Sequence, residues 1–199
     1  LLKLGASAAG CPCDVSVEAD VEAAFDQAME FLGRLDVTFV NAGIDGQNRD
    51  CLDIDAEFFR HVVSVNCIGS FLVARAAARR MPGGGAIVFN ASISGLAAEE
   101  GFADYSASKG GQVLLARTMA RELGPRGFWV TTICPGYVRT PQVEQYLNDP
   151  SIQADIVSRI PLGRVGDADE IASLVSYLAQ PGAAYLNGSV IPIDGGRLA

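Results

Sequence analysis

Short apolar runs alternate along the chain with longer stretches in which apolar residues recur at helical spacing. Ser16 is a candidate N-cap and Gly33 a stop; between them apolar residues recur at intervals of four, three and four, at Val21, Phe25, Ala28 and Leu32. Further helices are predicted over 56–81, 104–123 and 168–179, and strands over 35–40, 86–90, 128–134 and 190–193. This alternation favours an α/β fold built on a parallel sheet.

The stretch over 56–81 is apolar nearly all round, so we expect both faces of this helix to be buried. Gly83, Gly84 and Gly85 end it. Two short helical pieces follow much later, at 142–147 and 152–159, separated by Asn148, Asp149 and Pro150. Because no repeat, low-complexity segment or linker interrupts the pattern, we expect one domain over 1–199.

Polar or glycine-bearing residues follow a further strand, expected just before Asp14, and three of the strands above: Asp14, Asn41-Ala42-Gly43, Ala91-Ser92 and Pro135-Gly136. In open parallel sheets, ligands bind outside the carboxyl ends of the strands. The pattern therefore predicts where a site lies, before it indicates what the site does.

With 199 residues, about half of them apolar, the chain can bury a substantial core. Its net charge of −8 argues against nucleic-acid binding, and its scattered Lys and Arg argue against an anionic membrane as a partner. No apolar run approaches the roughly 20 residues that span a bilayer. Since no signal peptide is recognisable either, we expect a cytoplasmic protein.

The five cysteines do not suggest a disulfide scaffold. Cys11 and Cys13 form a C-x-C pair, but His61 is the only histidine and no second pair completes a zinc set, so no metal is expected. Cys13 and Cys134 lie in apolar runs that resemble strands. We interpret the cysteines as small buried hydrophobic residues.

Tyr105 and Lys109 are four apart on a predicted helix, so their side chains rise from the same face. An ammonium about 4 Å from a phenol, at an effective dielectric near 20, is worth roughly 4 kcal/mol. That would lower the phenol pKa by up to about three units and suit it to proton transfer. The pair alone is weak evidence, because this spacing is common by chance.

Ser92 strengthens the interpretation, because it leaves the preceding strand thirteen residues before Tyr105. A hydroxyl there could donate to a carbonyl oxygen while Tyr105 protonates it. Asn66 lies inside the apolar helix, where an asparagine is costly to bury without partners. It is either a satisfied core amide or the anchor of a water chain leading to Lys109, and we favour the second.

Together these residues resemble the short-chain dehydrogenase/reductase family, of the non-extended type that includes 3-ketoacyl carrier-protein reductases and many sugar and polyol dehydrogenases. The match covers nearly the whole chain. Its motifs run in order: D-V-S at 14–16, V-N-A-G at 40–43, V-N-C-I-G at 65–69, N-A-S-I-S-G at 90–95, Y-S-A-S-K at 105–109, P-G-Y-V-R-T at 135–140 and D-G-G at 194–196. The resemblance implies a Rossmann-like, three-layer, doubly wound parallel sheet and a catalytic tetrad of Asn66, Ser92, Tyr105 and Lys109.

The resemblance also implies NAD or NADP as cofactor and a small alcohol or ketone as substrate. It assigns cofactor contacts to Asp14, Val15, Asn41, Ala42, Gly43, Tyr105, Lys109, Pro135, Gly136, Val138 and Thr140. Within these, Asp14 and Val15 would hold the adenine, and Lys109 the nicotinamide ribose. Substrate contacts fall on Ser94, Phe102, Tyr137, Gln142 and Tyr146, with 141–160 as a lid; for Ser94 and Phe102, plain loop packing is an alternative.

One part of the family pattern is missing: no glycine-rich turn with its flanking strand and helix stands before 14–16. We therefore expect the sheet to lack the first βαβ portion, and the sequence does not show a preference between NAD and NADP. Either the real protein has this segment, which we favour, or the chain is a fragment that holds the dinucleotide poorly.

The leading hypothesis is an enzyme that interconverts a secondary alcohol and a ketone, with Tyr105 as acid/base. The alternative is a non-catalytic binding or regulatory protein on the same fold. An epimerase or lyase would reuse Tyr105 and Lys109, but the region after Thr140 is short for the larger substrate domain of extended relatives. The helices over 56–81 and from 104 resemble a family dimer interface, so a homotetramer or homodimer is expected.

Overall fold

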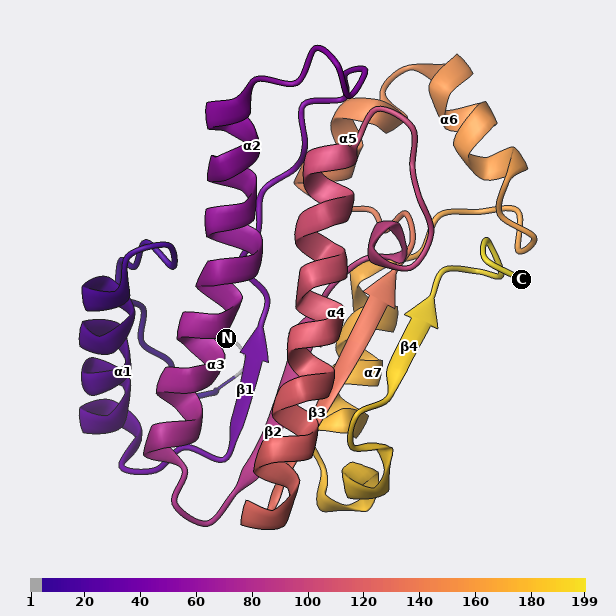
Figure 1. The fold of residues 1–199 in the computed structure, drawn as a ribbon. Helices are drawn as coiled ribbons and strands as arrows, with labels where there is room; N and C mark the ends of the chain where they lie inside the picture. Colours follow the sequence, from indigo (N-terminus) through magenta and orange to yellow (C-terminus); the bar gives the residue numbers. More distant parts are fainter. Residues whose placement is uncertain (1–4) are drawn as a thin grey trace.

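A computed structural model describes residues 5–199 and shows one four-stranded parallel sheet (Figure 1). Its strands lie in the order β1 (Val37–Val40), β2 (Gly85–Asn90), β3 (Phe128–Pro135) and β4 (Val190–Ile193). All three pairings are parallel. The strands lie in the sheet in the same order as in the sequence. The predicted α/β fold with a parallel sheet is confirmed.

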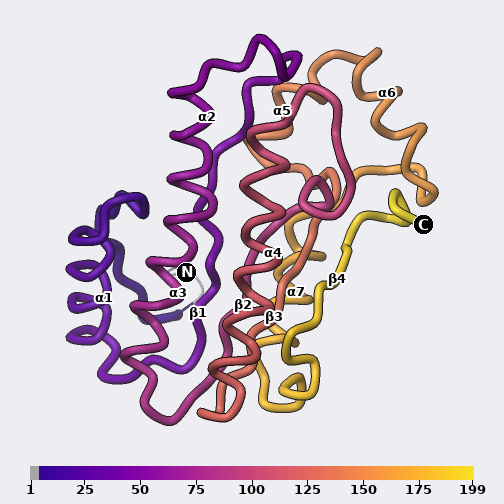
Figure 2. The backbone as a smooth tube through the Cα atoms, in the orientation of Figure 1, coloured from indigo at the N-terminus to yellow at the C-terminus, as the bar shows by residue number. Residues whose placement is uncertain are grey.

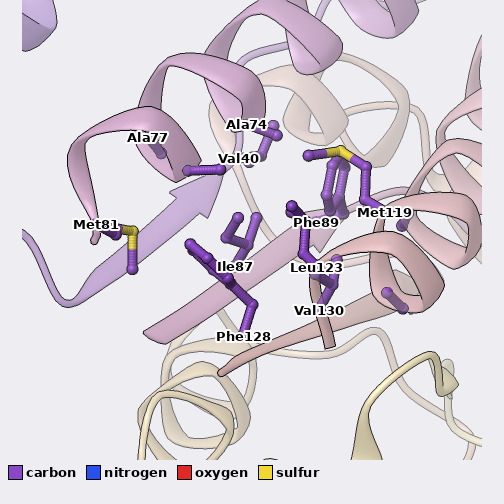
Figure 3. Close-up of a cluster of buried hydrophobic side chains, with 13 residues drawn as sticks. Val40, Ala74, Ala77, Met81, Ile87, Phe89, Met119, Leu123, Phe128 and Val130 are labelled. Atoms are coloured by element: carbon purple, nitrogen blue, oxygen red, sulfur yellow. The ribbon is translucent and has the colours of Figure 1, made fainter. Parts of the chain in front are cut away.

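Helices cover both faces of the sheet (Figure 1). On one face, α3 (Gly69–Arg80) and α4 (Ala103–Leu123) pack on Ile87, Phe89 and their neighbours, which form the largest buried cluster (Figure 3). On the other, Val88 packs with residues of α7 (Ala168–Leu178). Because side chains alternate across a strand, successive residues of β2 enter opposite cores. The three-layer arrangement is thus confirmed.

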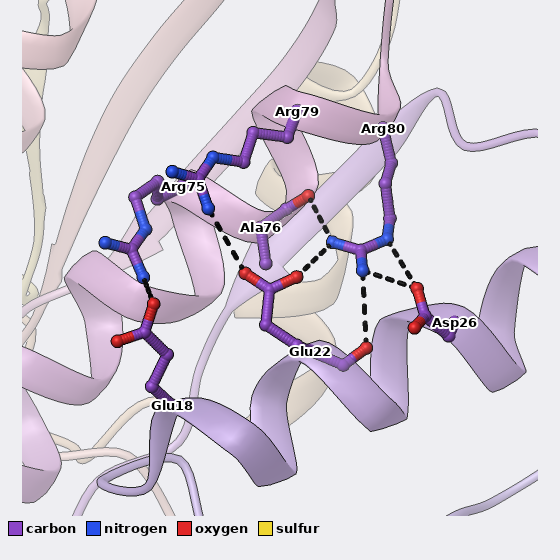
Figure 4. A network of polar contacts seen from close by, with 7 residues as sticks. All are labelled: Glu18, Glu22, Asp26, Arg75, Ala76, Arg79 and Arg80. Atoms are coloured by element: carbon purple, nitrogen blue, oxygen red, sulfur yellow. Dashed lines mark hydrogen bonds and ion pairs between the residues drawn. The ribbon is translucent and has the colours of Figure 1, made fainter.

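Helix α1 (Glu18–Leu32) lies beside α3 and is joined to it by ion pairs (Figure 4). Glu18 pairs with Arg75, whereas Arg80 pairs with both Glu22 and Asp26. Only 17% of the Arg80 side chain is exposed, so its charges are less screened than those of a surface pair. The predicted stop at Gly33 is present, in the left-handed conformation.

The predicted helix over 56–81 is one rod of 25 residues but not one uniform α-helix. It consists of α2 (Ala56–Val63), a π-helical turn (Ser64–Ile68) and α3. By length and composition alone it could cross a membrane, so the expectation that no apolar run approaches that length was wrong. Only half of its most apolar stretch is buried inside the fold, and Ile68 and Phe71 are exposed, so the expectation that both faces of this helix are buried was wrong.

A buried row of polar groups joins this rod to α4. Gln112 Nε2 donates to Ser70 Oγ, and Ser70 Oγ donates to the Asn66 carbonyl oxygen at 2.6 Å. Asn66 Nδ2 in turn donates to Ser108 Oγ at 3.0 Å. All four residues are at most 2% exposed, so each bond satisfies a group that water cannot reach.

The strand expected before Asp14 is not formed, and residues 6–13 are irregular. Pro12 lies between Cys11 and Cys13 and has no N–H for a strand ladder. Burial of the cysteines was wrongly predicted for Cys11, Cys13 and Cys51, which are exposed, whereas Cys134 is buried. Across residues 5–199, no group of three metal-ligating side chains comes together.

The short helices α5 (Pro141–Leu147) and α6 (Pro150–Ser158) follow the predicted pieces to within two residues. Thr140 and Asp149 cap their first turns by accepting backbone N–H groups. Figure 2 shows both helices beyond the carboxyl ends of the strands, close to the start of α4 and the loop that follows β1. The edge of the sheet at which a ligand was predicted to bind therefore lies beside the short helices and the loops.

Candidate active site

A cleft of about 590 Å³ opens at the carboxyl ends of the strands. It is lined by nine of the eleven residues predicted to contact a cofactor: Asn41, Ala42, Gly43, Tyr105, Lys109, Pro135, Gly136, Val138 and Thr140. Asp14 and Val15 are not among its lining residues. The Asp14 carboxylate instead accepts hydrogen bonds from the N–H and hydroxyl of Ser16, so an adenine contact for Asp14 and Val15 stays a prediction.

Tyr105 lies in the first turn of α4 and hydrogen-bonds Ser92, which follows β2. Burial raises the pKa of the phenol to about 12; the hydrogen bond with Ser92 lowers it, and the charges of Asp45 and Glu99 raise it further. At neutral pH the phenol is therefore protonated, and it can donate to an oxygen placed beside Ser92.

Lys109 lies one turn further along α4 and is only 4% exposed. Its Nζ donates to the Asn90 carbonyl oxygen at 2.9 Å and lies 5.5 Å from the centroid of the Tyr105 ring. Burial lowers the pKa of this amine to about 8. The expected net lowering of the phenol pKa was wrong: the pKa of Tyr105 is raised, and the largest cause is burial, which penalises the charged form.

Asn66 lies in the π-helical turn and is fully buried. Its Oδ1 accepts from the Ile44 N–H at 2.8 Å, and its Nδ2 donates to the Ile44 carbonyl at 3.0 Å as well as to Ser108. Of the two interpretations offered above, the contacts show the satisfied core amide. A π-helical turn often marks a functional site, and this one aims the amide at the loop that lines the cleft.

At Gly43 the loop that follows β1 runs close to two polar side chains. A Cβ at this position would lie 3.2 Å from Asn66 Oδ1 and 3.5 Å from Lys109 Nζ. The backbone of Gly43 therefore runs close to both polar groups, and by fixing this segment Asn66 acts near Lys109. A water chain from Asn66 to Lys109 stays a prediction.

A second pocket of about 230 Å³ adjoins the cleft and shares Ser92 and Tyr105 with it. All five predicted substrate residues line it: Ser94, Phe102, Tyr137, Gln142 and Tyr146. Helices α5 and α6 of the predicted lid both contribute to its wall. Tyr105 thus lies where the cleft and the second pocket join. A cofactor-sized molecule in the cleft and a smaller molecule in the pocket would both lie next to Tyr105.

The sequence did not point to three acidic residues of this second pocket: Asp45, Glu99 and Asp155. Tyr146 OH donates to Asp45 Oδ2 at 2.8 Å, and Tyr137 OH donates to Glu99 Oε1 at 2.9 Å. These partners lie 101 and 38 residues apart in the chain. No local spacing carries such a signal.

Comparisons with known proteins agree with this architecture. The sequence model of a family described as enoyl-(acyl carrier protein) reductase matches residues 1–197. The 3-oxoacyl-[acyl-carrier-protein] reductase MabA of Mycobacterium avium is 36% identical over 189 residues, which cover 94% of this chain and 73% of that protein. Levodione reductase of Leifsonia aquatica is 37% identical over 194 residues, which cover 94% and 73%.

Solved structures are similar as well. The crystal structure of levodione reductase superposes with a TM-score of 0.89 at 37% identity, over 93% of this chain and 75% of that one. The crystal structure of NAD⁺-bound xylitol dehydrogenase gives a TM-score of 0.93 at 30% identity, over 98% and 81%.

Proposed function

The chain belongs to the short-chain dehydrogenase/reductase family of NAD- or NADP-dependent oxidoreductases, and we propose that it interconverts a secondary alcohol and a ketone with Tyr105 as acid/base. Relatives named as a 2-(R)-hydroxypropyl-CoM dehydrogenase and a levodione reductase support chemistry at a CH–OH centre. The observation that carries the proposal is the Tyr105 phenol, hydrogen-bonded to Ser92 where the cleft meets the second pocket.

The cleft suits a nicotinamide cofactor. Lys109 Nζ has three hydrogens, and among the described residues it donates one hydrogen bond, to Asn90. The remaining donors lie in the cleft wall, where they suit the hydroxyls of a ribose. Val138 and Thr140 would hold the carboxamide, and Asn41 the adenosine side. When bound, the cofactor supplies or removes a hydride at its nicotinamide ring.

The protein's own contribution is to polarise the substrate and move one proton. In ketone reduction, the Ser92 hydroxyl donates a hydrogen bond to the carbonyl oxygen, and this bond strengthens as negative charge develops there. Tyr105, protonated at neutral pH, then gives its proton to the same oxygen. Lys109 is close enough to stabilise the phenolate that remains, and Asn66 keeps the loop at 41–44 in place.

Replacement of Tyr105 with Phe tests the proposal, since it removes the acidic hydroxyl and keeps the ring. We expect loss of turnover with largely unchanged binding of NADH or NADPH, followed by fluorescence titration of the intact protein. Tyr177→Phe, at a half-exposed position on α7, is the matched control and should keep full turnover. Substantial turnover by Tyr105→Phe contradicts the assignment. A folded protein that binds neither nucleotide supports the non-catalytic alternative.

We also propose that the protein is a cytoplasmic homodimer or homotetramer that uses its long helices. Ile68 and Phe71 on the rod that contains α3, and Leu114 on α4, are 48%, 39% and 64% exposed. Apolar side chains of this size are costly to leave in water, and an interface would bury them. Light scattering on the purified protein tests this, and Leu114→Glu should shift the mass toward the monomer.

A further inference from the structure

The pocket beside Tyr105 is acidic. Asp45, Glu99 and Asp155 line it, and within residues 5–199 no Lys or Arg does. The guanidinium groups nearby are already paired, Arg197 with Glu99 at 3.2 Å and Arg159 with Asp155 at 2.7 Å. Asp45 takes part in no ion pair with the described residues. A ligand in this pocket therefore meets net negative charge.

Hydrogen bonds within the pocket wall also determine which donors and acceptors remain free to bind a ligand. Tyr146 and Tyr137 both direct their hydroxyl hydrogens to carboxylates, Asp45 and Glu99, and so face a ligand mainly with oxygen lone pairs. The Asp45 carboxylate can accept about four hydrogen bonds and accepts two, from Tyr146 and from the Gly46 N–H. The pocket wall consequently offers hydrogen-bond acceptors to a ligand, and a matching ligand must supply hydrogen-bond donors.

Size and the remaining wall narrow the ligand further. A volume of about 230 Å³ lies below the roughly 300–1,000 Å³ typical of pockets for drug-sized ligands. Phe102, Ile152 and Ile156 supply an apolar side on which C–H groups can pack. A compact molecule with hydroxyls on one side and C–H groups on the other matches this surface.

We propose that the substrate of the reaction inferred above is a small, neutral, polyhydroxylated alcohol or its ketone, whose hydroxyl hydrogens are accepted mainly by Asp45. Glu99 already accepts hydrogen bonds from Ser94, Tyr137 and Arg197. Asp45 is then the main specificity residue, because its charge has no cationic partner among the residues described. Acids of similar size are rejected, since a carboxylate brings only acceptors and a second negative charge. The inference rests on the proposed function for the reacting carbon, but the ligand class can be measured without turnover.

Tyr146 is the positioning residue in this arrangement. It extends from α5 of the lid to Asp45 on the loop that follows β1, so one hydrogen bond both orients the carboxylate and holds the lid against that loop. Tyr146→Phe removes only the hydroxyl. We expect it to raise KM for a polyol several-fold with a smaller change in kcat, and to keep the discrimination against acids, because Asp45 retains its charge.

The experiment compares xylitol with xylonate, which differ at one end of the same carbon chain. Calorimetric binding to the full-length Tyr105→Phe protein, with oxidised cofactor present and no turnover expected, should favour xylitol by at least about tenfold. Asp45→Asn keeps the side-chain shape and removes the charge, so the preference should fall below about threefold, with xylonate binding more tightly than before. Asp53→Asn, an exposed acid on the same loop, changes the net charge equally and should leave the preference unchanged.

Three results overturn the inference: xylonate binding as tightly as xylitol, a preference that survives in Asp45→Asn, or no xylitol binding at high millimolar concentration. The proposed reaction fails separately. Asp45-dependent binding of xylitol without Tyr105-dependent turnover of any alcohol keeps the ligand class and rejects the reaction. Tyr105-dependent oxidation of a hydroxyl-poor alcohol such as cyclohexanol, without xylitol binding, keeps the proposed reaction and rejects the ligand class.

Discussion

The amide of Asn66 makes three hydrogen bonds from a fully buried position, so its replacement with Leu tests how the site is held. Each bond contributes about 0.5–1.5 kcal/mol net, and a buried partner left unpaired costs about 1–3 kcal/mol. Ile44 and Ser108 would lose their partner together. We therefore expect the free energy of unfolding to fall by roughly 2–4 kcal/mol.

Urea unfolding followed by circular dichroism measures this loss, and a thermal melt gives a second value. For a chain of this size, each kcal/mol lowers Tm by about 2–4 °C, so a fall of roughly 5–15 °C is expected. Asn148→Leu, at an exposed position after α5, is the matched control and should stay within about 0.5 kcal/mol of wild type.

The same variant should lose turnover even where it is fully folded, because the loop at 41–44 lines the cleft. An Asn66→Leu protein with the stability of the Asn148→Leu control would refute the bonding argument. A stable and fully active Asn66→Leu protein would also refute the positioning role that the hydrogen bonds to Ile44 imply.

Three further predictions concern charge and backbone. Burial lowers the pKa of Lys109 from 10.5 to about 8, so between pH 8 and pH 10.5 the unfolded chain binds more protons than the folded one. Over this range the free energy of unfolding of the wild type should rise with pH relative to that of Lys109→Met, as measured by urea unfolding. Gly84→Ala places a Cβ 2.2 Å from the Gly127 carbonyl oxygen at a φ of +80° and should cost more than about 3 kcal/mol, whereas Gly83→Ala, with open space around it, should be tolerated in the same assay. Arg80→Met should destabilise the protein by roughly 1–2 kcal/mol, and by less at high salt, in parallel urea titrations.

The sequence was informative wherever structure depends on local pattern. The strands and helices followed apolar periodicity, and the carboxyl ends of the strands brought Asn41 and Pro135 into one cleft. Tyr105 and Lys109 share a helix face because of their spacing, and Ser92 reaches them because it ends the neighbouring strand. The fold and the location of the candidate site were therefore predictable from the sequence.

Other features depend on contacts that no local pattern contains. The π-helical turn at Asn66 inserts one extra residue into an apolar helix that looked continuous. The pKa of Tyr105 follows from burial first and then from the charges of Asp45 and Glu99, and so moved opposite to the expectation from Lys109 alone. The segment before Asp14 shows a different limit: its apolar residues suggested a strand, but it stays irregular, and Pro12 has no N–H to give to a strand ladder.

The buried polar row from Gln112 to Ser108 has a consequence for how the molecule opens. Apolar helix faces tolerate several alignments, but sliding the rod one turn along α4 would leave these groups without partners, at about 1–3 kcal/mol for each. Only one alignment is then populated, and neither helix can leave without breaking the row. Amide hydrogens of α3 and the middle of α4 should consequently exchange with solvent at a common slow rate, as one cooperative unit.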